Sequence, residues 1–240
     1  MVLFMVYNST YAQVIDQTTG EFAYRMDLAY RRLTTDVYNP TFTKKFILAD
    51  VNIESDNPRR FYNFSGDLSG RYIEVMSLMQ KSSNIPFLRD LAKSVLKYQQ
   101  TDGRFGDPKL VFSAEQIGKQ HMALLWGNGR LLLGLLTYYN YSHDPEILAS
   151  AVKAGDFFIK VHGVCATPAI VRKLDGFGAT GIICLTQYTE SLVLLSKMTG
   201  DPKYAVKAAE LYKLLPERGI QHSHGYLTTL RGVLMLYDYT

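Results

Sequence analysis

The chain has 240 residues, of which 47% are hydrophobic, so it is long enough for one domain with a substantial core or for two small ones. This composition excludes a disordered chain, and 18 glycines with 8 prolines are too few for a collagen-like or low-complexity protein. The net charge is +4 and no run of five or six basic side chains occurs, so we expect no nucleic-acid partner.

The first twelve residues resemble the end of a secretory signal peptide. Residues 1–6 are wholly apolar, and residues 10–13 resemble its small-residue cleavage end. The basic start and the longer apolar stretch of a complete signal are missing. We therefore interpret residues 1–12 as the remnant of a signal whose start has been lost, with an ordinary hydrophobic N-terminal segment as the alternative. The first interpretation predicts a periplasmic or secreted protein, and the second a cytoplasmic one.

Two cysteines are too few for a fold built on disulfides. Cys165 and Cys184 are open to two interpretations, since they could pair in an oxidising compartment or remain separately buried thiols. No apolar stretch of 18 residues predicts a membrane span, because residues 126–130 interrupt the longest candidate.

Paired helices joined by proline-containing turns recur along the chain. Each turn proline stands at or near the first helical position, where its missing N–H costs nothing. Asp144 and Asp201 stand where an N-cap accepts the N–H groups of the first turn. Leu148, Val152 and Gly155 show the spacing of a helix that buries one face. In chain order, the expected helices span residues 68–80, 87–98, 129–141, 146–159, 181–197, 203–214 and 226–239.

This pattern predicts an all-α fold in which helical hairpins stack as a closed toroid or a solenoid, with little extended structure. The segment that ends at Thr240 looks like the helix end at Thr199, so the repeat stops within a unit. A closed toroid of six hairpins needs about 300 residues at usual helix and loop lengths. We therefore expect residues 13–240 to form a single (α/α)6-toroid-like domain of about seven or eight helices, truncated at its C-terminus.

Polar residues recur at one register of the inner helices, which are the more apolar helices that precede the turns. Equivalent positions on successive hairpins face the same direction, so these side chains can converge on one cavity. Counting back 12 residues from Ser83, Ser142, Thr199 and Thr240 gives Arg71, Arg130, Gln187 and Thr228, and three residues further on stand Glu74, Leu133, Glu190 and Arg231.

The segments before the inner helices predict a sugar-binding cleft. Residues 63–67, 125–129, 175–178 and 222–225 combine glycine, polar side chains and rings, and we expect them to be loops. Carboxylates orient hydroxyls or transfer protons, and aromatic faces offer an apolar platform. The residues expected at the substrate-facing rim are Asp67, Trp126, Asn128, Arg130, Gln187, Glu190 and His224, with Asp67 and Glu190 as the candidate catalytic carboxylates.

Each candidate also has a structural interpretation. Asp67 could be an N-cap or first-turn acid that stabilises its helix, and Trp126 could be a core residue. Glu74 and Glu190 could form structural ion pairs with Arg71 and Arg130 across neighbouring helices. His222 and His224 have a spacing that suits a metal pair, but no third or fourth ligand stands nearby, so we predict no metal site.

Residues 99–106, Gln-Gln-Thr-Asp-Gly-Arg-Phe-Gly, resemble the Q-x-x-D-G-x-x-G loop of β-L-arabinofuranosidase-type glycoside hydrolases, glycoside hydrolase family 127. Further similarity lies in residues 66–74, 126–159, 199–204 and 226–240, so the resemblance covers roughly residues 20–240.

The resemblance implies an (α/α)6 toroid that removes terminal sugars from complex glycans with retention. It also implies a cysteine nucleophile near a zinc ion, working with glutamates that belong to later hairpins, beyond residue 240. This chain therefore has no cofactor of its own in our prediction, and zinc is expected in the full-length family member. The family often has histidines around the third inner helix, where this chain has residues 126–130.

The main hypothesis is a glycoside hydrolase acting on complex glycans, or the N-terminal fragment of one. A non-catalytic α-hairpin module that binds a carbohydrate or a protein is the alternative, and a degenerate product without activity is a third possibility. A carbohydrate is the expected partner.

Overall fold

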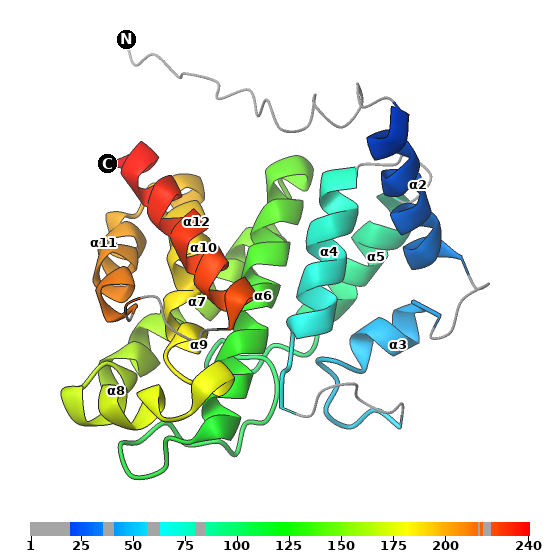
Figure 1. Cartoon of the computed structure of the whole chain (residues 1–240). Helices are drawn as coiled ribbons and strands as arrows, with labels where there is room; N and C mark the ends of the chain where they lie inside the picture. Colours follow the sequence, from blue (N-terminus) through cyan, green and yellow to red (C-terminus); the bar gives the residue numbers. More distant parts are fainter. Residues whose placement is uncertain (1–19, 36–40, 57–62, 80–84, 216, 218–221) are drawn as a thin grey trace.

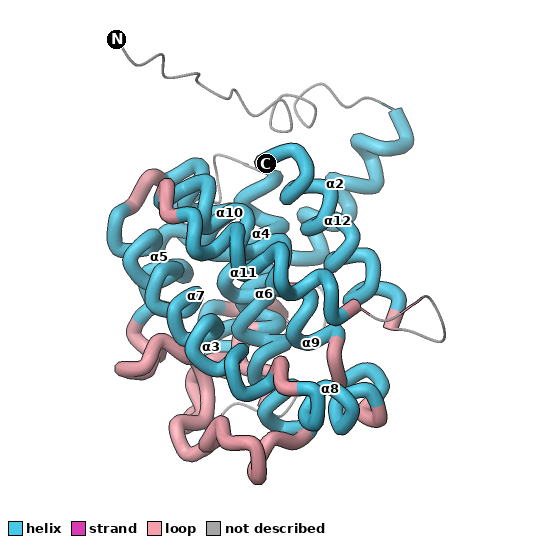
Figure 2. The backbone as a smooth tube through the Cα atoms, turned by 90° about the vertical axis from the view of Figure 1, so that its left-hand side faces the viewer, coloured by secondary structure: helices cyan, strands magenta, loops and turns pink. Residues whose placement is uncertain are grey.

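The computed structural model describes residues 20–35, 41–56, 63–79, 85–215, 217 and 222–240. Within these ranges helices are joined by loops without any strand (Figure 2), and extended residues pair in an isolated bridge between Gln99 and Phe105. The prediction of an all-α fold is confirmed. The signal remnant predicted at residues 1–12 lies outside the described residues.

The helices form successive hairpins (Figure 1). Their bounds are α2 Gly20–Thr34, α3 Lys44–Leu48, α4 Asp67–Met79, α5 Ile85–Leu96, α6 Lys119–Ser142, α7 Pro145–Cys165, α8 Pro168–Asp175, α9 Ile183–Thr186, α10 Tyr188–Thr199, α11 Pro202–Leu211 and α12 Ser223–Tyr239, with short 3-10 turns at Gly178–Thr180 and Tyr212–Leu214. Inner helix α6 packs between α4 and α10, and α10 packs against α12, while α5, α7 and α11 pack outside their partners. The predicted array of hairpins is therefore present, and α2, α3 and α8 add to it.

The predicted turn chemistry is confirmed at two hairpins. The Asp144 carboxylate accepts the backbone N–H of Glu146 at 3.0 Å, and the Asp201 carboxylate accepts that of Lys203 at 2.9 Å. Both aspartates are N-caps in extended conformation, each followed by proline. The cap satisfies an N–H group that has no partner within the helix.

The prediction that residues 125–129 form a loop is wrong, because α6 begins ten residues earlier than the expected start at residue 129. Gly127 and Gly129 were the reason for expecting a loop. A Cβ on Gly127 would overlap the backbone of Phe64 and Ser65, and one on Gly129 would lie 2.9 Å from the Tyr188 ring. These glycines are therefore needed for close packing, which here outweighs their low helix propensity.

The inner helix predicted at residues 181–197 is divided at Gln187 into α9 and α10. The carbonyl oxygen of Thr186 accepts the Thr189 hydroxyl at 2.7 Å, a side-chain bond that competes with regular helical bonding. Gln187 itself keeps right-handed helical dihedral angles, so the interruption is local.

The closest helix packing in the array joins α4 and α6. A Cβ on Gly70 of α4 would overlap the carbonyl group of Arg130, and a Cβ on Gly134 of α6 would overlap the carbonyl oxygen of Gly70. The two backbones approach this closely because neither glycine has a side chain. α4 and α6 consequently share the most extensive contact between helices.

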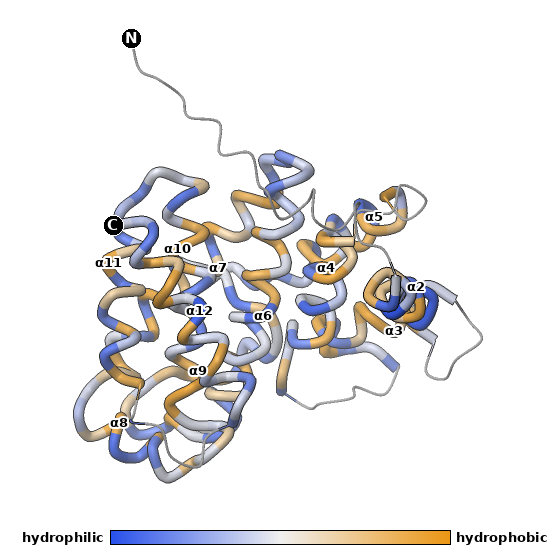
Figure 3. The backbone as a smooth tube through the Cα atoms, turned by 45° about the horizontal axis from the view of Figure 1, so that its top comes forward, coloured by the Kyte–Doolittle hydropathy of each residue, from blue (hydrophilic) through white to orange (hydrophobic). Residues whose placement is uncertain are grey.

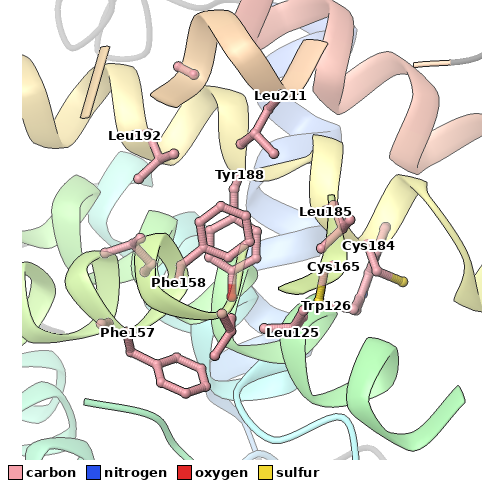
Figure 4. Packing of buried hydrophobic residues seen from close by; sticks show 14 of the residues in the cluster. Leu125, Trp126, Phe157, Phe158, Cys165, Cys184, Leu185, Tyr188, Leu192 and Leu211 are labelled. Carbon is pink, nitrogen blue, oxygen red and sulfur yellow. The ribbon is translucent and has the colours of Figure 1, made fainter. Parts of the chain in front are cut away.

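Most of the core lies between α6, α7, α10 and α11, and a second cluster lies between α3, α4, α5 and the opposite side of α6. Hydrophobic residues, orange in Figure 3, occur along α4, α6 and α10. The Phe158 and Tyr188 rings stack with centroids 3.6 Å apart, close to Cys165 (Figure 4). Cys165 and Cys184 are buried free thiols, which answers the question left open by the sequence. Burial raises the pKa of the Cys165 thiol to about 12.

Helix α12 presents large apolar side chains to solvent. The exposed fractions are 62% for Leu227, 67% for Leu234 and 82% for Tyr237, whereas its face toward α10 carries the smaller Thr229 and Gly232. In the described part of the chain, no helix combines the length and apolarity that crossing a membrane requires.

Gly134→Ala is expected to lower the free energy of unfolding by about 2 kcal/mol, because the new methyl group meets a backbone oxygen that cannot rotate away. Chemical denaturation measures the change. Gly163→Ala on α7 is the matched control, since a Cβ there meets nothing within 4 Å and should stabilise the helix by up to about 1 kcal/mol. Equal effects of the two substitutions would contradict the role given to the α4–α6 contact.

Candidate functional site

A pocket of about 380 Å³ opens between the first turns of α4, the first half of α6, the 3-10 turn at Gly178–Thr180 and the N-cap of α12. Its wall combines an acid, a base and aromatic rings with small and apolar groups. The lining residues are Phe64, Asp67, Leu68, Arg71, Trp126, Ala179, Thr180 and His222.

Asp67 is the acidic group of this pocket. It is the first residue of α4, where a negative charge also favours the helix dipole. Its Oδ1 atom accepts two hydrogen bonds, from the Trp126 indole N–H at 2.9 Å and from the Arg71 Nε–H at 2.9 Å. The two interpretations of Asp67 are therefore compatible, because a first-turn acid lines the pocket.

Trp126 is a core residue, as one interpretation of the sequence held, and it also borders the pocket. Only 5% of the residue is exposed and it belongs to the main core cluster, yet it also lines the pocket. The His222 and His224 rings approach it edge-on, with centroids 5.5 and 5.7 Å from the indole. Trp126 thus connects α6 to the start of α12.

His224 connects α12 to α4, because its Nδ1 atom lies 3.4 Å from Nη2 of Arg71. Partial burial and the nearby Arg71 and Arg130 cations lower the pKa of His224 to about 4. The imidazole is therefore neutral at pH 7. His222 has a different role, since its side chain accepts the Gly225 N–H at 3.3 Å and caps α12.

Four charged side chains from four inner helices form a second cluster beside the pocket. Glu74 of α4 pairs with Arg130 of α6, and Arg231 of α12 lies 2.8 Å from Glu190 of α10 and 3.6 Å from Glu74. Burial raises the pKa of Glu190 and lowers that of Arg130. The Arg130 Nε atom is buried without a hydrogen-bond partner among the described residues. Ion pairs of Glu74 and Glu190 with Arg71 and Arg130 were one interpretation of the sequence. Glu74 pairs with Arg130, whereas Glu190 pairs with Arg231 and Arg71 pairs with Asp67.

Asn128 and Gln187 bind backbone rather than lining the pocket. The Asn128 amide accepts the Phe105 N–H at 2.8 Å and donates to the carbonyl oxygens of Phe105 and Ser65 at 2.9 and 3.0 Å. The Gln187 amide donates to the Trp126 carbonyl oxygen at 3.0 Å. Both residues are 2% exposed, so their role in this structure is to fix the chain behind Trp126.

The structure thus brings Asp67 and Trp126 into the pocket wall and His224 into contact with Arg71 and Trp126. Arg130 and Glu190 lie in the charged cluster. The predicted rim did not include Arg71, although the register of the inner helices placed it among the side chains that converge on one cavity. Phe64 and His222 belong to the segments predicted to form the cleft but were not named as rim residues, and Leu68, Ala179 and Thr180 were missed.

Among the described residues, no three His, Cys, Asp or Glu side chains are grouped so that they could hold a metal ion. The two thiols are buried in the apolar core, which opposes the thiolate form that zinc requires. The described residues therefore do not fit a zinc site.

The sequence model of β-L-arabinofuranosidase, GH127 catalytic domain, matches residues 8–214 of the chain. The comparison of the chain with curated proteins found no match.

Glu74→Gln is expected to lower the free energy of unfolding by about 3 kcal/mol, because it removes the countercharge of the buried Arg130 guanidinium. Chemical denaturation at pH 7 measures the loss. Glu210→Gln is the control, since Glu210 pairs with Lys207 at the surface and its loss should cost less than about 1 kcal/mol. A similar small loss for both variants would show that the Glu74–Arg130 pair is not the stabilising interaction described here.

Trp126 is the only tryptophan of the chain, so its fluorescence reports on the pocket. Protonated imidazole quenches indole emission, and we expect a quenching transition with a midpoint near pH 4 as His224 is protonated. The titration uses a His222→Gln background, because His222 also lies close to the indole. Adding His224→Gln should abolish the transition, whereas His143→Gln on the α6–α7 turn should leave it unchanged. A transition that persists without His224 would contradict the assignment.

Proposed function

The chain belongs to the β-L-arabinofuranosidase family of GH127 catalytic domains, and on this basis we propose that it is a glycoside hydrolase, or part of one, that removes terminal sugars from complex glycans. The observation that carries the proposal is the Asp67 carboxylate, held in the wall of the pocket by the Trp126 indole.

The pocket has the composition of a sugar site. Its volume of about 380 Å³ is within the usual range for small ligands. Asp67 offers an acceptor for hydroxyl groups, Arg71 offers donors, and the rings of Phe64 and Trp126 supply apolar surface for the C–H groups of a sugar. The carboxylate and the guanidinium balance one another, so the site suits a ligand without net charge.

Within the described residues we assign Asp67 to substrate binding. Retaining hydrolysis needs two groups about 5 Å apart on opposite sides of the scissile bond. Glu190, the second candidate, is paired with Arg231 and is absent from the pocket lining. Asp67 and Glu190 therefore do not form the pair of groups that retaining hydrolysis needs.

One observation favours the alternative, a module that binds a glycan without cleaving it. Each acidic side chain at the site is engaged by a basic partner, Asp67 by Arg71, Glu74 by Arg130 and Glu190 by Arg231. A carboxylate whose oxygens are already bound by a basic side chain is poorly placed to reach the oxygen of a leaving group. The chain by itself would then retain sugar binding but lack turnover.

The test measures nitrophenol release from both anomers of 4-nitrophenyl L-arabinofuranoside and, separately, the change in Trp126 fluorescence on adding the matching methyl glycosides. We expect saturable binding that Asp67→Ala weakens at least about tenfold, because a charged acceptor is lost. Glu210→Ala, far from the pocket, serves as the control. Turnover lost with Asp67→Ala would exclude the binding-only alternative, whereas binding without turnover that survives Asp67→Ala and Glu190→Ala together would exclude catalysis by this chain.

A further inference from the structure

The Asp67 carboxylate uses its two oxygens unequally. Both the Trp126 indole and the Arg71 guanidinium donate to Oδ1, and no described residue donates to Oδ2. Two donors from different helices fix the plane of the carboxylate, which would otherwise rotate about its last side-chain bond. Because Asp67 lines the pocket, Oδ2 is the acceptor that it offers to a bound molecule.

The Arg71 guanidinium is also held by two side chains, and some of its N–H groups remain without a described partner. Its Nε–H binds Asp67 and its Nη2 atom faces Nδ1 of His224, while the guanidinium has five N–H groups in all. Its side chain is 39% exposed and lines the same pocket. An acceptor oxygen and unused donors therefore stand side by side on one turn of α4.

The contact with Arg71 determines the tautomer of His224. A guanidinium can only donate, so Nδ1 of His224 must accept and the ring proton must lie on Nε2. A protonated His224 ring would be repelled by the positive charge of Arg71, and Arg130 and the His222 ring also lie nearby. Among the described residues, Asp67 is the anion that would favour the protonated ring. At neutral pH the imidazole thus holds Arg71 from the side of α12.

From this geometry we propose that Asp67 and Arg71 form a binding site for a vicinal diol, with Trp126 as the positioning residue of the carboxylate. One hydroxyl donates to Oδ2 of Asp67, and its neighbour accepts from the Arg71 guanidinium. A phosphate or carboxylate ligand is disfavoured because it would approach Asp67 with like charge. This inference rests on the proposed function and specifies which part of the sugar the pocket recognises.

The test compares methyl L-arabinofuranoside, which carries a 2,3-diol, with its 2-deoxy and 3-deoxy analogues by isothermal titration calorimetry. We expect the intact glycoside to bind the unmodified protein about tenfold more tightly than either analogue, because each analogue leaves one polar group unpaired. Arg71→Lys keeps the charge but loses the planar fork, and should reduce this preference. Leu68→Ala, which changes an apolar lining residue, should weaken the three ligands equally.

Trp126→Phe tests positioning, because it keeps an aromatic ring in the wall and removes the indole N–H, together with part of the ring volume. The affinity for the intact glycoside and for the analogue that keeps the hydroxyl bound to Asp67 should fall about tenfold, while the affinity for the other analogue changes less. Circular dichroism verifies the fold of each variant, and Arg71→Lys tests the diol site even if Trp126→Phe unfolds.

The outcomes separate this inference from the proposed function. If the unmodified protein binds the glycoside and both analogues equally, the diol site is excluded while sugar binding stands. If no glycoside binds at all, the proposed function fails as well. If Trp126→Phe weakens all three ligands to the same extent, the indole acts through packing alone and its positioning role is excluded.

Discussion

The contact of two glycines, Gly70 on α4 and Gly134 on α6, sets the distance on which the pocket depends. With the two backbones this close, side chains on either side of the contact must meet. Toward the helix start, Asp67 reaches the Trp126 indole, and within the array Glu74 reaches Arg130. A bulkier residue at either glycine would separate both pairs at once, so one steric constraint determines a binding group and a buried ion pair.

The charged cluster of Glu74, Arg130, Glu190 and Arg231 restricts the helices to one relative arrangement. Glu74, Arg130, Glu190 and Arg231 come from four different inner helices, and Arg130 is almost completely buried. A shift of any one helix would leave a buried charge without its partner, at a cost of several kcal/mol. Apolar packing alone tolerates such shifts better, since leucine surfaces fit one another in several registers. The polar interior therefore favours one arrangement of the helices and, with it, one arrangement of the pocket wall.

The hairpin architecture was predictable because its signals are local. Asp144 and Asp201 are each followed by proline, a pair that marks a helix start independently of contacts with the rest of the chain. Both residues are N-caps in the structure. Gly127 and Gly129 were misleading, since glycine weakens an isolated helix and the contacts that explain these two lie up to about 60 residues away in the sequence. The register of inner-helix polar residues indicated that Glu190 faces the interior. The register did not indicate that Arg231 would be the partner of Glu190, because the pairing depends on how far each arginine side chain extends toward the neighbouring helix. Asp67 and Trp126 were expected at the rim, but their hydrogen bond to one another was not.

The link between Arg71 and His224 also has a consequence for how the protein is made. These residues are 153 positions apart, so at the usual rates of translation His224 is synthesised about 8 to 30 s after Arg71. Asp67 and Trp126 can pair well before that, once α6 has left the ribosome. Throughout the interval the pocket lacks its α12 wall, and Phe64, Leu68 and the indole edge face solvent. The binding site is thus completed only once the start of α12 has been made, and until then its apolar wall is a surface through which a nascent molecule can aggregate.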